Sequence, residues 1–240
     1  MEASGNAEWK HAFVLKEADV RKVWELLQLH IGTVACSGEC ADGITRQFGD
    51  VDKILEFNNA KQKGFKRIVF DSMSEDRSNF ANLEFSENRW KPISVRISGS
   101  EEVVVKLKGE IEDVIHGMRP WYSRFTRVDF FYVGLAILSP LSGFLLVLSQ
   151  GRRIKSLTMN GAIQAFVGST VLVFVIGVSI WILNKLRERL FPICCFALGQ
   201  GKDRYATQEK IRWGLVWVIV PLIIASVGWL LHIIATSIVA

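Results

Sequence analysis

The stretch "FKRIVFDSMSEDRSNFANLEFSENRWKPISVRISG", residues 65–99, decides the fold of the first half of the chain. It contains three runs with alternating or apolar patterns, "FKRIVFDS", "NFANLEFS" and "PISVRISG", with short polar segments between them. Such runs, bounded by turn-forming residues, are typical of β-strands. The stretch therefore predicts three consecutive strands.

Helical patterns flank these strands on both sides. Upstream, "EADVRKVWELLQLHIG" at 17–32 places apolar residues on one helical face, and "SEEVVVKLKGEIEDVIHGM" at 100–118 opens with Ser100 as N-cap and two acids that suit the helix dipole. Between them, "GTVACSGECADGITRQFG" at 32–49 reads as a hairpin, and Asp50 as the N-cap of a short helix. The order β-α-β-β-α-β-β-β-α predicts an α+β domain over residues 1–120, with an antiparallel sheet and helices on one face.

The second half of the chain contains three long apolar runs. Residues 130–149 and 161–183 carry no charge, and residues 213–239 contain only the titratable His232. Because about 20 apolar residues suffice to cross a bilayer, we expect three transmembrane helices at these positions, within a membrane domain over 130–240. Pro140 or Pro221 would instead make its span a kinked or re-entrant element.

Charge is distributed unevenly between the two halves. Residues 1–128 contain 19 Lys and Arg against 20 Asp and Glu, whereas residues 129–240 contain 10 against 4. Because the basic excess flanks apolar segments, it indicates a lipid bilayer as partner, and no nucleic acid is expected. The positive-inside rule then predicts a multi-pass membrane protein with a cytoplasmic N-terminus and the C-terminus outside.

Two polar segments adjoin the apolar runs. In "GMRPWYSRF", residues 117–125, aromatic and basic residues alternate, which predicts an interfacial junction over 121–129. In "LFPICCFALGQGKDRYATQEKIRWG", residues 190–214, a similar mixture predicts a cytoplasmic interfacial collar over 184–212, with a solvated loop as the alternative. The residues expected to act at the interface or in coupling are Arg119, Trp121, Tyr122, Arg124, Arg127, Phe191, Pro192, Arg204, Tyr205, Arg212 and Trp213.

Small residues recur in the second apolar run. Gly161, Ala165, Gly168 and Ser169 lie on one helical side, and small residues at this spacing let helices approach closely. We therefore expect them to pack helices together, and a homo-oligomer is the expected assembly.

Signals of chemistry are scarce along the chain. No phosphate-binding, dinucleotide-binding, zinc-protease or nucleophile-elbow motif is present, and the four histidines are scattered. Cys36 and Cys40, like the adjacent Cys194 and Cys195, lack the spacing of a zinc site. We expect the side chains of Cys194 and Cys195 to pack as small apolar groups, and palmitoylation is the alternative. We therefore expect that the protein is not an enzyme and that it binds no metal and no cofactor.

The overall layout of the chain is similar to that of a known class of protein. The similarity rests on the segments "RPWYSR" and "LFPICCFALGQGKDRYATQEKIRW". The chain resembles small bacterial membrane proteins with a cytosolic α+β sensor domain and C-terminal spans, such as the membrane effectors of phage-defence (antiviral) systems. This implies a sensor or effector of the bacterial inner membrane. Its soluble domain would bind a ligand or protein, and its helices would oligomerise or rearrange to perturb the membrane or form a pore. The alternatives are a membrane-tethered scaffold without pore activity and an enzyme with its site at the collar.

Overall fold

The computed structural model describes residues 2–136 and 159–239, and for parts of the long helices it describes the backbone alone. The chain divides into two compact units. One consists of Met1–Pro120 together with Cys194–Ala240, and the other of Trp121–Ile193. Each unit is described by itself below.

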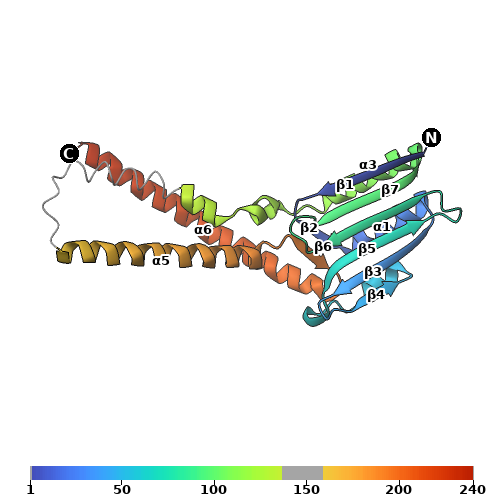
Figure 1. Cartoon of the computed structure of the whole chain (residues 1–240), viewed down its shortest axis with the longest axis horizontal. Coiled ribbons are helices and arrows are strands. Elements are labelled where there is room, and N and C mark those ends of the chain that lie inside the picture. Colours follow the sequence, from blue (N-terminus) through green and yellow to red (C-terminus); the bar gives the residue numbers. More distant parts are fainter. Residues whose placement is uncertain (1, 137–158, 240) are drawn as a thin grey trace. The chain divides into compact units, whose positions relative to one another are not determined.

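A six-stranded sheet forms the body of the first unit (Figure 1). Every pair of neighbouring strands is antiparallel, in the order β1-β7-β6-β5-β3-β4. The three strands predicted from residues 65–99 are therefore present as consecutive antiparallel neighbours. The strands are β1 (Glu2–Trp9), β3 (Thr33–Cys40), β4 (Thr45–Phe48), β5 (Phe65–Met73), β6 (Phe80–Ser86) and β7 (Ile93–Ser100).

One face of this sheet is covered by two helices, α1 (Glu17–His30) and α3 (Glu101–Gly117). The strands turn alternate apolar side chains toward these helices, such as Phe70 of β5 and Leu83 of β6, both fully buried. The opposite face is polar, with Arg67 paired to Glu84 at 2.7 Å. This division agrees with the predicted α+β domain that has its helices on one side.

The remaining elements of the first unit connect this body to a long helix. A short helix, α2 (Val51–Glu56), and a 3-10 turn, η1 (Lys61–Lys63), lead into β5. Strand β2 (Phe13–Lys16) pairs with β8 (Cys194–Ala197) in a separate two-stranded parallel sheet. Helix α6 (Gly201–Val239) follows directly after β8.

The second unit contains the 3-10 helix η2 (Trp121–Arg127) and the long helix α5 (Met159–Leu190). Two polar side chains of α5 hold the backbone that follows η2. The guanidinium of Arg187 donates to the Val128 carbonyl oxygen, and the Asn184 amide oxygen accepts from the N–H of Phe130 at 3.2 Å. Arg187 is almost completely buried, so its charge is held by groups inside the unit.

The prediction of three transmembrane helices is contradicted. Within residues 2–136 and 159–239, no helix is long and apolar enough to cross a membrane. Part of the first predicted span, residues 137–149, lies outside the described residues. The membrane domain, the multi-pass localisation and the assigned sides of the two termini all depended on these spans, and we withdraw them. The bilayer as a partner stays a prediction.

The physical reason lies in where the helices begin and end. The sequence argument counted residues without charge, whereas the helices extend beyond those runs into charged segments. Helix α6 begins at Gly201 and includes Lys202, Arg204 and Arg212, while the last turns of α5 include Arg187 and Arg189. Charged groups are costly to bury in hydrocarbon, and a count of uncharged residues takes no account of where the helix that contains them begins and ends.

Candidate functional site

Strand β8 inserts the segment just before α6 into the α+β domain. Its residues pair in parallel with β2, with Phe13 opposite Cys194 and Leu15 opposite Phe196. Phe13 and Leu15 are fully buried, and Phe196 is nearly so. Parallel strands are normally joined by a long connection, and here the two strands come from opposite ends of the chain. The start of α6 is therefore fixed by the core of the domain.

Asn59 holds β8 in place through both ends of its side-chain amide. Its Nδ2 donates to the Phe196 carbonyl oxygen at 2.9 Å, and its Oδ1 accepts from the Phe65 N–H at 2.9 Å. The residue is 1% exposed, so water cannot replace either bond. One buried amide thus connects the first residue of β5 to β8.

Two glycines let the chain turn from β8 into α6. Gly199 has a φ of +48°, and a Cβ placed there would lie 2.6 Å from the Phe57 carbonyl oxygen. At Gly201, a Cβ would collide with the Phe196 carbonyl oxygen. The left-handed conformation and the close backbone approach both favour glycine. These two positions explain why the segment contains its glycines.

Charged residues of the first turn of α6 also reach the domain. The Arg204 guanidinium donates to the Asn59 carbonyl oxygen, and the Lys202 ammonium lies 2.6 Å from a carboxylate oxygen of Glu17, the first residue of α1. Helix α6 therefore contacts both the segment before β5 and the start of α1. We call the set Asn59, Phe65, Phe196, Gly199, Gly201, Lys202 and Arg204 the β8 junction.

Aromatic side chains extend the β8 junction into the core. The Phe196 ring packs edge-on against Phe13 and Phe65, with ring centroids 5.9 and 6.1 Å apart. Phe65 in turn contacts Phe57 at 4.8 Å and Phe48 at 6.1 Å. Aromatic pairs at these separations add specific packing energy to their burial. The cluster connects β8 with the end of β4.

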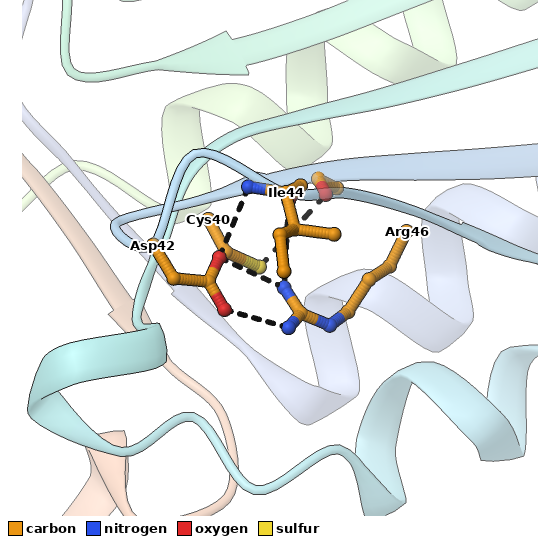
Figure 2. Close-up of polar contacts among 5 residues, drawn as sticks. Cys40, Asp42, Ile44 and Arg46 are labelled. Atoms are coloured by element: carbon orange, nitrogen blue, oxygen red, sulfur yellow. Dashed lines mark hydrogen bonds and ion pairs between the residues drawn. The ribbon is translucent and has the colours of Figure 1, made fainter.

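The turn of the β3–β4 hairpin is held by polar side-chain contacts (Figure 2). The Arg46 guanidinium forms two bonds to the Asp42 carboxylate, at 2.6 and 3.1 Å, and the Ile44 N–H donates to the same carboxylate at 3.1 Å. The Arg46 side chain lowers the pKa of Asp42 to about 2. The same guanidinium lies 5.3 Å from the centre of the Phe57 ring, a cation–π distance.

The cysteines of β8 are poor nucleophiles. Burial raises the pKa of Cys195 to about 11, although Arg212 and Arg204 act in the opposite direction. Burial also raises the pKa of Cys194 well above its usual value. Because the thiolate is the reactive form, the raised pKa values keep both thiols protonated and weakly nucleophilic at neutral pH.

A cavity of about 890 Å³ opens beside the second half of α1. Trp24 and Gln28 of α1 line it, together with the turn before β3 and the start of α2. Three carboxylates, Glu25, Asp50 and Glu75, also line it, and among the described residues the lining has no Lys or Arg. Its acidic lining favours a cationic group.

Several residues predicted to act in coupling are brought together in the second unit. The Phe191 ring contacts Trp121, Tyr122 and Phe125 at centroid distances of 6.3, 5.7 and 6.1 Å. Tyr122 is fully buried. Pro192, which directly follows Phe191 in the sequence, is half-buried. The basic residues Arg119, Arg124 and Arg127 are exposed.

The other predicted coupling residues lie on α6. The Arg212 guanidinium is fully buried and lies 5.2 Å from the centre of the Tyr205 ring, whereas Trp213 is half exposed. Residues 201–212 of the predicted collar are thus the first turns of a helix, and 194–197 are a strand. The small residues Gly161, Ala165, Gly168 and Ser169 are in α5, but the packing expected of their side chains lies outside the described residues.

Sequence reasoning missed Asn59, Phe65 and Phe196. The β-prone run "ICCFAL" at 193–198 carried a weak strand signal that the neighbouring apolar runs obscured. Nothing local distinguishes Asn59 from Asn58, because only the folded backbone decides which amide is buried.

In the described part of the chain, no group of three or more His, Cys, Asp or Glu residues is arranged to hold a metal ion. No protein-family model matches the chain, and neither a curated protein nor a solved structure shows significant similarity to it. Any function must therefore be argued from the geometry above.

Proposed function

We propose that the protein is a sensor or effector in which the α+β domain binds a ligand or protein partner and the β8 junction transmits binding to helix α6. The observation that carries this proposal is the Asn59 amide, which bonds β8 and β5 at once inside the core. A helix that was merely attached to the domain would need no such buried polar contact, because burying an amide is favourable only when its bonds are made.

Helix α1 provides a route from a binding site to the β8 junction. The second half of α1 lines the 890 Å³ cavity, and its first residue, Glu17, pairs with Lys202 of α6. A rigid helix of 14 residues joins these two points. A cationic ligand, or a basic side chain of a partner protein, that entered the cavity and displaced α1 would also shift the contacts of α6.

A surrogate ligand tests this coupling. Gln28→Cys in the full chain places a thiol in the cavity, and the trimethylammonium-ethyl methanethiosulfonate reagent then adds a cationic group there. The native cysteines interfere little, because burial raises the pKa of all four. Hydrogen–deuterium exchange followed by mass spectrometry then reports on the peptides that contain β8 and the first turns of α6.

We expect modification at residue 28 to change exchange in those peptides, and Asn59→Ala to remove that response. Lys22→Cys is the matched control, because it is an exposed position on the same helix that does not line the cavity. An unchanged exchange pattern in β8 and α6 after complete modification at residue 28 would show that the domain and the helix are not coupled.

The exposed aromatic residues of the long helices favour a second candidate, a scaffold that assembles partners without transmitting a signal. Trp181 of α5 and Trp217 of α6 are 66% and 75% exposed. Large apolar side chains exposed on the surface of a helix are typical of sites that contact a partner. A scaffold predicts no response of α6 to the modified cavity, so the same experiment distinguishes the two functions.

A further inference from the structure

The outer edge of β1 is a long strand edge that has no proline, no lysine and no bulge. Strand β1 runs in regular register along β7, from Glu2 opposite Ser100 to Trp9 opposite Ile93, without a bulge. Within the described part of the chain, no strand pairs with its other side, and Figure 1 shows it at one border of the sheet. A proline, a bulge or charged side chains, above all lysine, usually prevent further pairing at a long edge. The only charged residues of β1 are Glu2 and Glu8, near its two ends.

The opposite border of the sheet differs. Strand β4 has four residues against the eight of β1. Its edge begins at the turn that Arg46 and Asp42 hold together. A short edge strand with a charged side chain is a poor template for another strand. The sheet is thus protected at one border and open at the other.

We infer that β1 pairs antiparallel with β1 of a second copy of this chain, so that two six-stranded sheets join into one. In a two-fold pair, residues opposite each other lie on the same face of the sheet. The two-fold axis therefore lies midway between one residue of the strand and the same residue of the second copy. We call this an axis through that residue, and each choice of residue fixes a different set of opposing side chains.

An axis through Asn6 gives complementary charges. It places Glu2 opposite Lys10 of the second copy, and it does so twice because of the symmetry. An axis through Gly5 would instead place Glu2 opposite Glu8, and like charges directly opposite each other destabilise a strand pair. Of these two registers, the charge pattern of residues 2–10 favours the one centred on Asn6.

The shape of the inner face agrees with this register. Ala3, Gly5, Ala7 and Trp9 point toward the helices, and Trp9 is half-buried against the core. With the axis at Asn6, Trp9 lies opposite Ala3 of the second copy. The small side chain leaves room for the indole ring to cover it, so apolar area is buried on both sides of the axis.

Cross-linking tests the register directly. In Asn6→Cys, the two thiols lie opposite each other, because directly paired Cα atoms are about 4.5–5.5 Å apart, within disulfide range. In the control Ser4→Cys, the two thiols are about 14 Å apart and cannot join. Mild oxidation of a fresh lysate that contains the full chain, followed by a non-reducing gel, separates the dimer from the monomer.

We expect Asn6→Cys to give a covalent dimer and Ser4→Cys to remain monomeric. Independently, Lys10→Glu and Glu2→Lys should each weaken the purified dimer about five-fold in sedimentation equilibrium, and the double variant should restore it. Both residues are exposed, so the substitutions leave the fold intact. Equal cross-linking at positions 4 and 6, or a double variant as weak as the single ones, would overturn the proposed pairing.

Discussion

The Asn59 side chain donates to the carbonyl oxygen of Phe196, 137 residues away in the chain, at 2.9 Å. This bond joins a loop in the first quarter of the sequence to the strand that precedes α6. Because the same amide also accepts from the Phe65 N–H, both of its polar ends are satisfied in a buried position. The relationship makes Asn59 the most informative single site for the predictions that follow.

Replacing Asn59 with alanine should destabilise the protein by about 2–4 kcal/mol. The change leaves the Phe65 N–H and the Phe196 carbonyl oxygen buried without this partner, and each such group costs about 1–3 kcal/mol. Denaturant unfolding of the full chain measures the effect. Asn58→Ala is the matched control, because Asn58 is exposed and its loss should change stability by less than about 0.5 kcal/mol. Equal effects of the two substitutions would refute the assigned role.

Alanine substitutions at two glycines should have opposite signs. Gly199→Ala should destabilise by about 2 kcal/mol or more, because its left-handed φ is strained for alanine and the new Cβ meets the Phe57 carbonyl oxygen. Gly109→Ala, within α3, meets nothing within 4 Å and should stabilise by about 0.5–1 kcal/mol. Thermal unfolding of both variants measures the contrast. A neutral Gly199→Ala would mean that the chain turns differently before α6.

The cysteines should react slowly with alkylating reagents in the native protein. With a pKa of about 11 for Cys195 and about 12 for Cys36, only about one thiol in a thousand and one in ten thousand is ionised at pH 8. Iodoacetamide labelling followed by peptide mass spectrometry should therefore modify Cys195 slowly and Cys36 more slowly still. Each rate should rise about ten-fold per pH unit below its pKa. Rapid labelling of Cys195 without denaturant would show that β8 detaches from β2.

The ion pair in the hairpin turn should contribute to stability in a defined pH range. Arg46 lowers the pKa of Asp42 to about 2, below the value of about 3.9 expected in the unfolded chain. A depressed folded-state pKa means that the contribution is present above pH 4 and is lost as the pH falls toward 2. Urea midpoints measured from pH 5 to pH 2 should therefore fall less steeply in Asp42→Asn than in the wild type. Parallel pH profiles would contradict the pairing.

The sequence by itself determined the elements of the α+β domain. The alternation in residues 65–99 produced β5, β6 and β7, and the Ser100 cap began α3, because its hydroxyl accepts from the Val103 N–H. Periodicity and capping are local properties, since they depend on residues only a few positions apart. For the same reason they could be read without any knowledge of the fold.

Counting uncharged residues did not determine the structure of the second half. The charged segment between the apolar runs was predicted to form an interfacial collar over residues 184–212, whereas residues 201–212 are the first turns of α6. Charged residues are good helix formers, so their presence does not end a helix. Where α6 begins depends on the turn at Gly199 and on the strand before it, which the charge pattern does not encode.

Only the tertiary structure decided the β8 junction. The strand β8 exists because β2, at the other end of the sequence, offers it a partner. Asn59 matters because Phe65 and Phe196 meet beside it, whereas its neighbour Asn58 faces solvent. Contacts between residues so far apart depend on the packing of the whole core, and a pattern confined to a few neighbouring residues carries no information about them.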